Sequence, residues 1–277
     1  GSSWYYLRYV DPKNKKEFAS KKNLEHWLPI DWYNGGMEHT TLHLLYSRFW
    51  NIFLHDIGAS PVAEPYAKRT SHGMILGAGG MKMSKSKGNV VNPDEMVSRY
   101  GADVFRVYEL FIGPFDQAIP WDERGIEGAR RFLEKVWQVQ LSGKADAVGV
   151  NPALERLAHR TVQKVGDDIE AMGYNTAVSA MMIFVNACAE AGTAPRNVWE
   201  RFLTILAPFA PHLAEELWSR LGHETSIHTE LWPPFDPALC ADMTATIVVQ
   251  VNGKLRATVT APRGADQPTV EALARAA

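Results

Sequence analysis

The stretch GMILGAGGMKMSKSKGNVVNPDE, residues 73–95, contains a strand signal, a charged loop and a helix start in that order. Residues 73–77 form a short apolar run that begins and ends with glycine. Further along, Asn92 stands before Pro93, and Glu95 takes the third helical position, an order typical of a capped helix N-terminus. This succession of strand, turn and helix favours an open α/β sheet in the first part of the chain.

The charged loop, residues 82–89 (KMSKSKGN), places three lysines within six residues. One interpretation is a solvated surface turn. The other is a loop that closes on phosphates, because ammonium groups on a mobile loop neutralise the charge of a departing phosphate. The loop is not of the Walker type, since the order Gly-x4-Gly-Lys-Ser/Thr is absent.

Upstream of the charged loop, an apolar run at residues 28–33 leads to Asn34-Gly35-Gly36, which predicts a turn. A long helix is predicted next, because apolar residues recur at steps of three and four from Leu42 to Phe53. Gly58 stands where that helix is expected to end.

Residues 35–39 (GGMEH) combine several features of a ligand site at the start of this helix. Glycines let a ligand approach the backbone, a helix N-terminus offers free N–H groups, and Glu38 is a candidate acceptor for ribose hydroxyls. His39 and His43 share one helix face, so two packed histidines or a metal site with Glu38 are alternatives. The zinc-protease order His-Glu-x-x-His is not met.

Residues 120–222 carry no strand signals, and glycine or proline separates successive amphipathic patterns. This arrangement predicts a helical bundle. The predicted helices cover residues 131–137, 154–169, 174–189, 198–206 and 212–221.

Residues 246–251 and 254–259 flank Asn252-Gly253, which predicts a β-hairpin with a two-residue turn. A single hairpin is too small to be stable by itself. We therefore expect it to open a further domain, with a short helix near residues 270–277.

The composition is that of a globular protein with a core: 277 residues, 46% hydrophobic and 22% charged. The formal net charge of -2 means that any contact with nucleic acid must be local. No apolar run approaches the roughly 20 residues of a membrane span, and no signal peptide is evident. Cys188 and Cys240 make neither a disulfide framework nor a metal knuckle, so a reducing cytoplasm is expected.

Together these residues resemble class I aminoacyl-tRNA synthetases, and among them the bacterial-type leucyl enzymes. The sequence KMSKS at residues 82–86 matches the class signature letter for letter. Other segments resemble the leucyl enzymes or their valyl and isoleucyl relatives in the same order along the chain. These segments are residues 2–9, 31–49, 100–103, 175–177, 206–218 and 249–256.

The resemblance implies the second half of a Rossmann-type catalytic domain over residues 1–115, a helical tRNA-binding bundle over 116–238 and the start of a C-terminal domain over 239–277. It implies ATP-dependent ligation of leucine to tRNA(Leu) through leucyl-adenylate, with Mg²⁺ bound to ATP. The implied catalytic residues are Lys82 and Lys85. The implied ATP and adenylate residues are Gly35, Gly36, Glu38, His39, the backbone of Met74 and Ile75, and the loop residues Lys82, Met83, Ser84, Lys85 and Ser86. The implied leucine residues are Ser3, Tyr33 and His43.

The first family signature, His-x-Gly-His, has no counterpart here, since residues 55–60 (HDIGAS) lack the second histidine. The resemblance therefore implies a fragment or one part of a split enzyme, inactive alone, with the N-terminal half as its partner. Two alternatives stay open: a non-catalytic tRNA-binding module, or a valyl, isoleucyl or methionyl enzyme. Apart from this resemblance, Met74 and Ile75 are best interpreted as an ordinary core strand.

Overall fold

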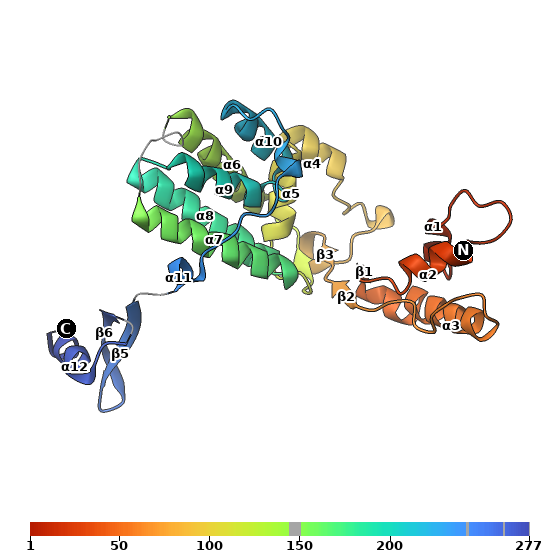
Figure 1. The fold of residues 1–277 in the computed structure, drawn as a ribbon, viewed down its shortest axis with the longest axis horizontal. Helices are drawn as coiled ribbons and strands as arrows, with labels where there is room; N and C mark the ends of the chain where they lie inside the picture. The colour runs from red at the N-terminus through yellow and green to blue at the C-terminus, as the bar shows by residue number, and fades with distance from the viewer. Residues whose placement is uncertain (144–150, 242–243, 263, 277) are drawn as a thin grey trace. The chain divides into compact units, whose positions relative to one another are not determined.

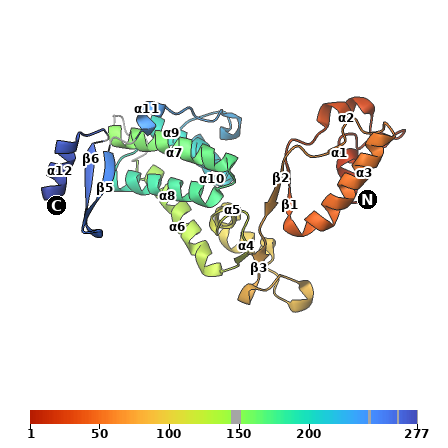
Figure 2. The ribbon, with the colours of Figure 1, turned by 90° about the horizontal axis from the view of Figure 1, so that it is seen from below.

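The computed structural model describes residues 1–143, 151–241, 244–262 and 264–276, which form two compact units. Unit 1 comprises residues 1–131 and 172–176, and unit 2 comprises residues 132–171 and 177–277. Figures 1 and 2 show the succession of elements in each unit from two directions. Within the described residues, no helix is long and apolar enough to cross a membrane.

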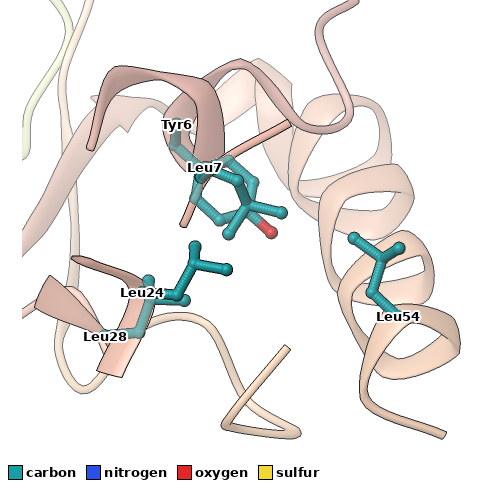
Figure 3. Close-up of a cluster of buried hydrophobic side chains, with 6 residues drawn as sticks. Tyr6, Leu7, Leu24, Leu28 and Leu54 are labelled. Carbon is teal, nitrogen blue, oxygen red and sulfur yellow. The ribbon is translucent and has the colours of Figure 1, made fainter. Parts of the chain in front are cut away.

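Unit 1 begins with three helices, α1 (Tyr5–Tyr9), α2 (Lys21–Trp27) and α3 (His43–Asp56), around a small apolar core. Figure 3 shows side chains of α1 and α2 in this core, with Leu54 approaching from α3. The buried residues of the core are Tyr6, Leu7, Ala19, Leu24, Leu28 and Leu54. The predicted long helix is confirmed, and it ends before Gly58, which has φ +75°.

A parallel strand pair leads from this core to the rest of unit 1. Strand β1 (Tyr33–Gly36) pairs with β2 (Arg69–His72), so that Tyr33 lies opposite Arg69. The prediction of a turn at Asn34-Gly35-Gly36 was therefore wrong, because pairing with a distant segment holds these residues extended. The sequence analysis did not anticipate β2.

The second strand pair of unit 1 is β3 (Ile75–Leu76) with β4 (Ile119–Pro120), again parallel. Helices α4 (Pro93–Tyr100) and α5 (Ala102–Phe111) lie between these strands in sequence. The predicted start of α4 is confirmed, since Asn92 Oδ1 accepts a hydrogen bond from Asp94 N at 3.1 Å. Four short 3₁₀ helices complete the unit: η1 (Met37–Thr41), η2 (Ala78–Gly80), η3 (Lys85–Lys87) and η4 (Glu123–Gly125).

Helix α3 buries polar side chains and exposes large apolar ones. Ser47 and Asn51 are buried, and the Asn51 amide donates to Val62 O at 2.8 Å and to Ala63 O at 2.9 Å. Phe49, on the other side of the helix, is 72% exposed. We call the exposed side the α3 apolar face; it consists of Leu45, Tyr46, Phe49, Ile52 and Phe53.

The predicted helical bundle is confirmed, and most of it forms unit 2. Its helices are α6 (Ile126–Leu141), α7 (Pro152–Glu170), α8 (Tyr174–Ala191), α9 (Arg196–Leu206) and α10 (Pro211–Arg220). Phe184 and Trp199 pack on Phe202, with ring centroids 5.1 Å and 4.9 Å away. Trp199 Nε1 also donates to Gln140 Oε1 at 2.8 Å, so α6 and α9 are joined by a polar contact as well as by packing.

Unit 2 ends with η6 (Ile227–Thr229), α11 (Pro237–Cys240), the hairpin β5 (Thr244–Val251) and β6 (Lys254–Pro262), and α12 (Gln267–Ala276). The predicted hairpin is confirmed. Asn252 and Gly253 have φ of 52° and 75°, which the right-handed twist of a two-residue hairpin requires.

Replacing Phe184 with alanine should lower the free energy of unfolding by about 3–5 kcal/mol, because a buried ring is lost and a cavity remains. Urea titration followed by circular dichroism measures the change. Ile183, the neighbour of Phe184, is 60% exposed, so the matched variant Ile183→Ala should change stability by less than about 0.5 kcal/mol. Equal effects of the two variants would contradict the described packing of α8.

Candidate functional site

A cavity of about 230 Å³ lies in unit 1, where α1, β1 and the start of α3 meet. Its lining residues are Ser2, Tyr5, Tyr33, Asn34, Gly35, His39, His43, Leu44 and Arg69. Tyr33, Gly35, His39 and His43 were candidate site residues from the sequence, and the fold brings them together. Ser3, another candidate, is not among the lining residues, whereas Ser2 is.

A chain of hydrogen bonds fixes the aromatic wall of this cavity. Tyr33 Oη is 2.5 Å from Tyr5 Oη and 2.7 Å from His43 Nε2. The His43 ring stacks on Tyr5 at 5.3 Å, and the Tyr33 ring stacks on Tyr66 at 4.1 Å. Tyr66 Oη donates to Ser47 Oγ of α3 at 2.8 Å, so α3 also fixes the ring on which Tyr33 stacks.

Burial keeps the polar groups of this wall neutral. It raises the pKa of Tyr33 well above its ordinary value, and it lowers the pKa of His43. Near neutral pH both groups are therefore uncharged. An apolar side chain bound against this wall would meet aromatic rings and a neutral hydrogen-bonded end, while the charged Arg69 lies at the cavity edge.

Arg69 joins β1 to β2 at the cavity edge and was not recognised from the sequence. Its Nη2 donates to Gly36 O at 3.1 Å and to Gly35 O at 3.4 Å. Its Nη1 donates to Ser71 Oγ at 2.8 Å. These contacts hold the two-glycine segment extended.

Glu38 lies over Gly36 at the end of β1. A Cβ atom on Gly36 would stand 2.2 Å from Glu38 Oε2, so a side chain at this position would displace the carboxylate. Hydrogen bonding to its own backbone N–H lowers the pKa of Glu38, and the charges of His39, Lys82 and His72 act in the same direction. The carboxylate is thus ionised and open to a donor from outside.

Asn89 holds the charged loop in shape. Its Nδ2 donates to Lys82 O at 3.3 Å, and its Oδ1 accepts from Ser84 N at 2.8 Å. Gly88, with φ +63°, makes the left-handed turn that returns the chain to Asn89. Asn89 is part of the quoted loop, but its role was not predicted, although an asparagine after a glycine is a common loop-closing signal.

The loop begins at the edge of β3, where Leu76 forms an antiparallel bridge with Lys82. The side chains of Lys82 and Lys85 are exposed, whereas Met83 and Ser84 are partly buried. Ser84 Oγ and Ser86 Oγ lie 2.7 Å apart. The two lysines thus extend into solvent from an ordered backbone.

Two other sequence interpretations concern Met74, Ile75 and a possible metal. The carbonyl of Met74 accepts a hydrogen bond from Ile119 N at 3.0 Å, so it is occupied by the strand pairing.

In the part of the chain that the structure describes, no group of three histidine, cysteine or acidic side chains is placed to hold a metal ion.

Comparison with known proteins matches most of the chain to two families. Residues 12–122 match the model of tRNA synthetases class I (I, L, M and V), and residues 152–271 match the anticodon-binding domain of tRNA ligase. The chain belongs to the class I tRNA synthetases.

Within that class, the chain is a homologue of leucine--tRNA ligase. It is 52% identical over 256 residues to the leucine--tRNA ligase of Alkaliphilus oremlandii, covering 92% of this chain and 32% of that ligase. It also resembles the LeuRS of Agrobacterium radiobacter K84, solved as a ternary complex with tRNA and LeuAMS. That likeness has a TM-score of 0.84 at 32% identity, covering 98% of this chain and 38% of the solved one. The chain thus spans about a third of the length of these relatives.

We expect His43 to titrate below its ordinary pKa of 6.5, because burial disfavours the imidazolium. The neutral ring stabilises the fold fully above pH 6.5, and this contribution is lost as pH falls from 6.5 through the lowered pKa. Urea titrations between pH 5 and 8 should show this loss in the wild type and not in His43→Gln.

The control is His26→Gln, because His26 is exposed on α2. This variant should keep the wild-type loss of stability below pH 6.5. An NMR titration of His43 at or above 6.5 would contradict the expectation.

Proposed function

We propose that this chain carries the adenylate-forming residues and part of the tRNA-binding region of a leucine--tRNA ligase. The reaction joins leucine to tRNA(Leu) with ATP, through leucyl-adenylate, and we place it in the cytoplasm. The observation that carries the proposal is that a cavity with a neutral aromatic wall lies beside Glu38 at the end of β1, near Lys82 of the charged loop. The 52% identity to a leucine--tRNA ligase favours leucine over valine, isoleucine or methionine.

The cavity supplies the amino-acid pocket in this proposal. Tyr5, Tyr33 and Leu44 give it apolar walls, and a volume of about 230 Å³ suits a small aliphatic side chain. Tyr33 Oη is held by a partner on each side, so the pocket is shaped before the substrate arrives. In this proposal the serine that lines the leucine pocket is Ser2, instead of the predicted Ser3.

Glu38 and the two glycines supply the nucleotide side. The ionised carboxylate is suited to accept hydrogen bonds from the ribose hydroxyls of ATP. A Cβ atom on Gly35 would meet nothing within 4 Å, so open space for a ligand lies beside this backbone. His39, next to Glu38 in sequence, lines the same cavity. The backbone of Ile75 remains our candidate for the adenine contact.

Lys82 and Lys85 supply positive charge for the chemical step. As the leucine carboxylate displaces pyrophosphate, negative charge grows on the departing phosphates, and ammonium groups stabilise it. Asn89 holds Lys82 and Ser84 at a fixed separation, which limits how the lysines can approach. Mg²⁺ would arrive with ATP and would take most of its ligands from phosphate and water.

Glu38→Gln should raise the KM for ATP about tenfold or more, because a charge-assisted hydrogen bond to the ribose is weakened. The assay is ATP–pyrophosphate exchange by this chain combined with the rest of the homologous ligase. Leucine, valine, isoleucine and methionine are compared as substrates, and leucine should give the fastest exchange.

The matched control is Glu95→Gln, since Glu95 is an exposed carboxylate in the first turn of α4. It should leave the KM within about twofold of the wild-type value. Absence of leucine-dependent exchange in a folded, associated complex would refute the proposed function.

The α3 apolar face supports a partner for unit 1. The five large apolar side chains of this face are exposed, and each strand pair in unit 1 has only two described strands. Parallel sheets normally have both faces covered. We propose that the remaining part of the catalytic domain, which the longer relatives provide, covers this face.

Phe49→Asp should weaken association with the remaining part of the catalytic domain at least tenfold, because it places a charge where an aromatic ring would be buried. Analytical ultracentrifugation of the mixture measures this. The control is Lys22→Asp, at an exposed position on α2, and this variant should associate like the wild type. Equal association of Phe49→Asp and wild type would exclude the α3 apolar face as the interface.

Unit 2 supplies the contact with tRNA in this proposal. Most of residues 152–271, which match an anticodon-binding domain, lie in this unit, and such domains read RNA largely through shape and phosphates. A purely tRNA-binding module remains the alternative, and the pyrophosphate exchange assay separates it from the enzyme.

A further inference from the structure

The loop after α1 and the first two residues of α2 are unusually rich in lysine. Residues 13–22 (KNKKEFASKK) contain five lysines and a single acidic residue, Glu17, for a net charge of +4. The whole chain has a net charge of -2, so this segment runs against the overall balance. All five lysines are exposed. We call residues 13–22 the lysine-rich segment; in Figure 1 it covers the end of the red loop and the start of α2.

Arg8 of α1 holds the backbone of this segment in a defined shape. Its Nη1 donates to Glu17 O and to Phe18 O, both at 3.0 Å, and its Nη2 donates to Asn14 O at 2.6 Å. One guanidinium thus satisfies three carbonyls of the same loop. The lysines project from a backbone that is ordered before any ligand arrives.

Asp11 and two packed side chains complete this support. Asp11 Oδ2 accepts hydrogen bonds from Asn14 Nδ2 at 2.8 Å and from Ser20 N at 2.9 Å. The Phe18 ring packs edge-on against Trp4 at 6.2 Å, and Ala19 is 3% exposed. The apolar residues of the segment thus face inward and the lysines face outward.

The chain itself leaves most of this charge unbalanced. Lys21 lies 3.8 Å from Glu25, an exposed pair. For Lys13, Lys15, Lys16 and Lys22, no ion pair forms with any residue that the structure describes. Ammonium groups held close together repel one another, and a bound anion with several charges relieves that repulsion.

We propose that the lysine-rich segment binds the phosphate backbone of tRNA; this inference rests on the proposed function. Lysine is a compact point charge that neutralises phosphates without reading bases. The apolar residues of the segment, Phe18 and Ala19, are partly or fully buried. Its exposed surface therefore offers positive charge and little apolar area for a protein partner. The contact is therefore independent of RNA sequence and sensitive to salt.

The test compares the full wild-type chain with a variant that carries Lys13→Gln, Lys15→Gln, Lys16→Gln and Lys22→Gln. Fluorescence anisotropy with labelled tRNA gives Kd at several KCl concentrations. Each lost phosphate contact reduces the slope of log K against log[KCl] by about 0.7–0.9. We expect the variant to lose about two to four such contacts and to bind at least tenfold more weakly at 100 mM KCl.

A second variant with arginine at the same four positions keeps the charge, and it should retain the wild-type Kd and salt slope. This separates loss of charge from damage to the fold, as does an unchanged circular dichroism spectrum. An unchanged Kd and slope in the glutamine variant would overturn the proposal. So would equal weakening in the glutamine and arginine variants, or a wild-type chain that binds no tRNA. Pyrophosphate exchange needs no tRNA, so it still tests the proposed function separately.

Discussion

The parallel pairing of β1 with β2 is the constraint on which the candidate site depends. Placing Tyr33 opposite Arg69 directs the tyrosine hydroxyl to Tyr5 and His43, and it lets the guanidinium bond the carbonyls of Gly35 and Gly36. A shift of one residue would turn every side chain of the strand to the other face. The cavity, the neutral aromatic wall and the position of Glu38 all follow from this one register.

Local signals predicted the elements that depend on local chemistry. The cap at Asn92, the helices of the bundle and the Asn252-Gly253 turn came directly from the sequence, because each is stabilised by near neighbours in the chain. The segment Asn34-Gly35-Gly36 was misjudged as a turn because its partner strand lies more than thirty residues away. Propensity is a weak guide where long-range pairing supplies the hydrogen bonds.

The residues of the candidate site also fall into two groups, those that local motifs predicted and those that depend on long-range structure. Residues within quoted motifs, such as Glu38 and His43, were found from the sequence, whereas Tyr5, Arg69 and Asn89 were not. Tyr5 and Arg69 reach the cavity through the phase of a five-residue helix and the register of a short strand, and neither feature has a strong pattern. Ser3 was a candidate, but Ser2 lines the cavity, and both serines lie in the turn before α1, where no periodic pattern distinguishes them.

Helix α3 shows how unit 1 keeps a site formed while leaving an apolar surface for a partner. Its inward side is held by directed hydrogen bonds of Ser47 and Asn51, which specify one orientation of the helix. Its outward side is the α3 apolar face, and each large side chain there would contribute about 1.5–3 kcal/mol on full burial. Because the hydrogen bonds fix the helix before the apolar face is covered, His43 and the cavity keep their geometry in the uncovered unit. The partner that we propose for this face would then add stability without having to create the site.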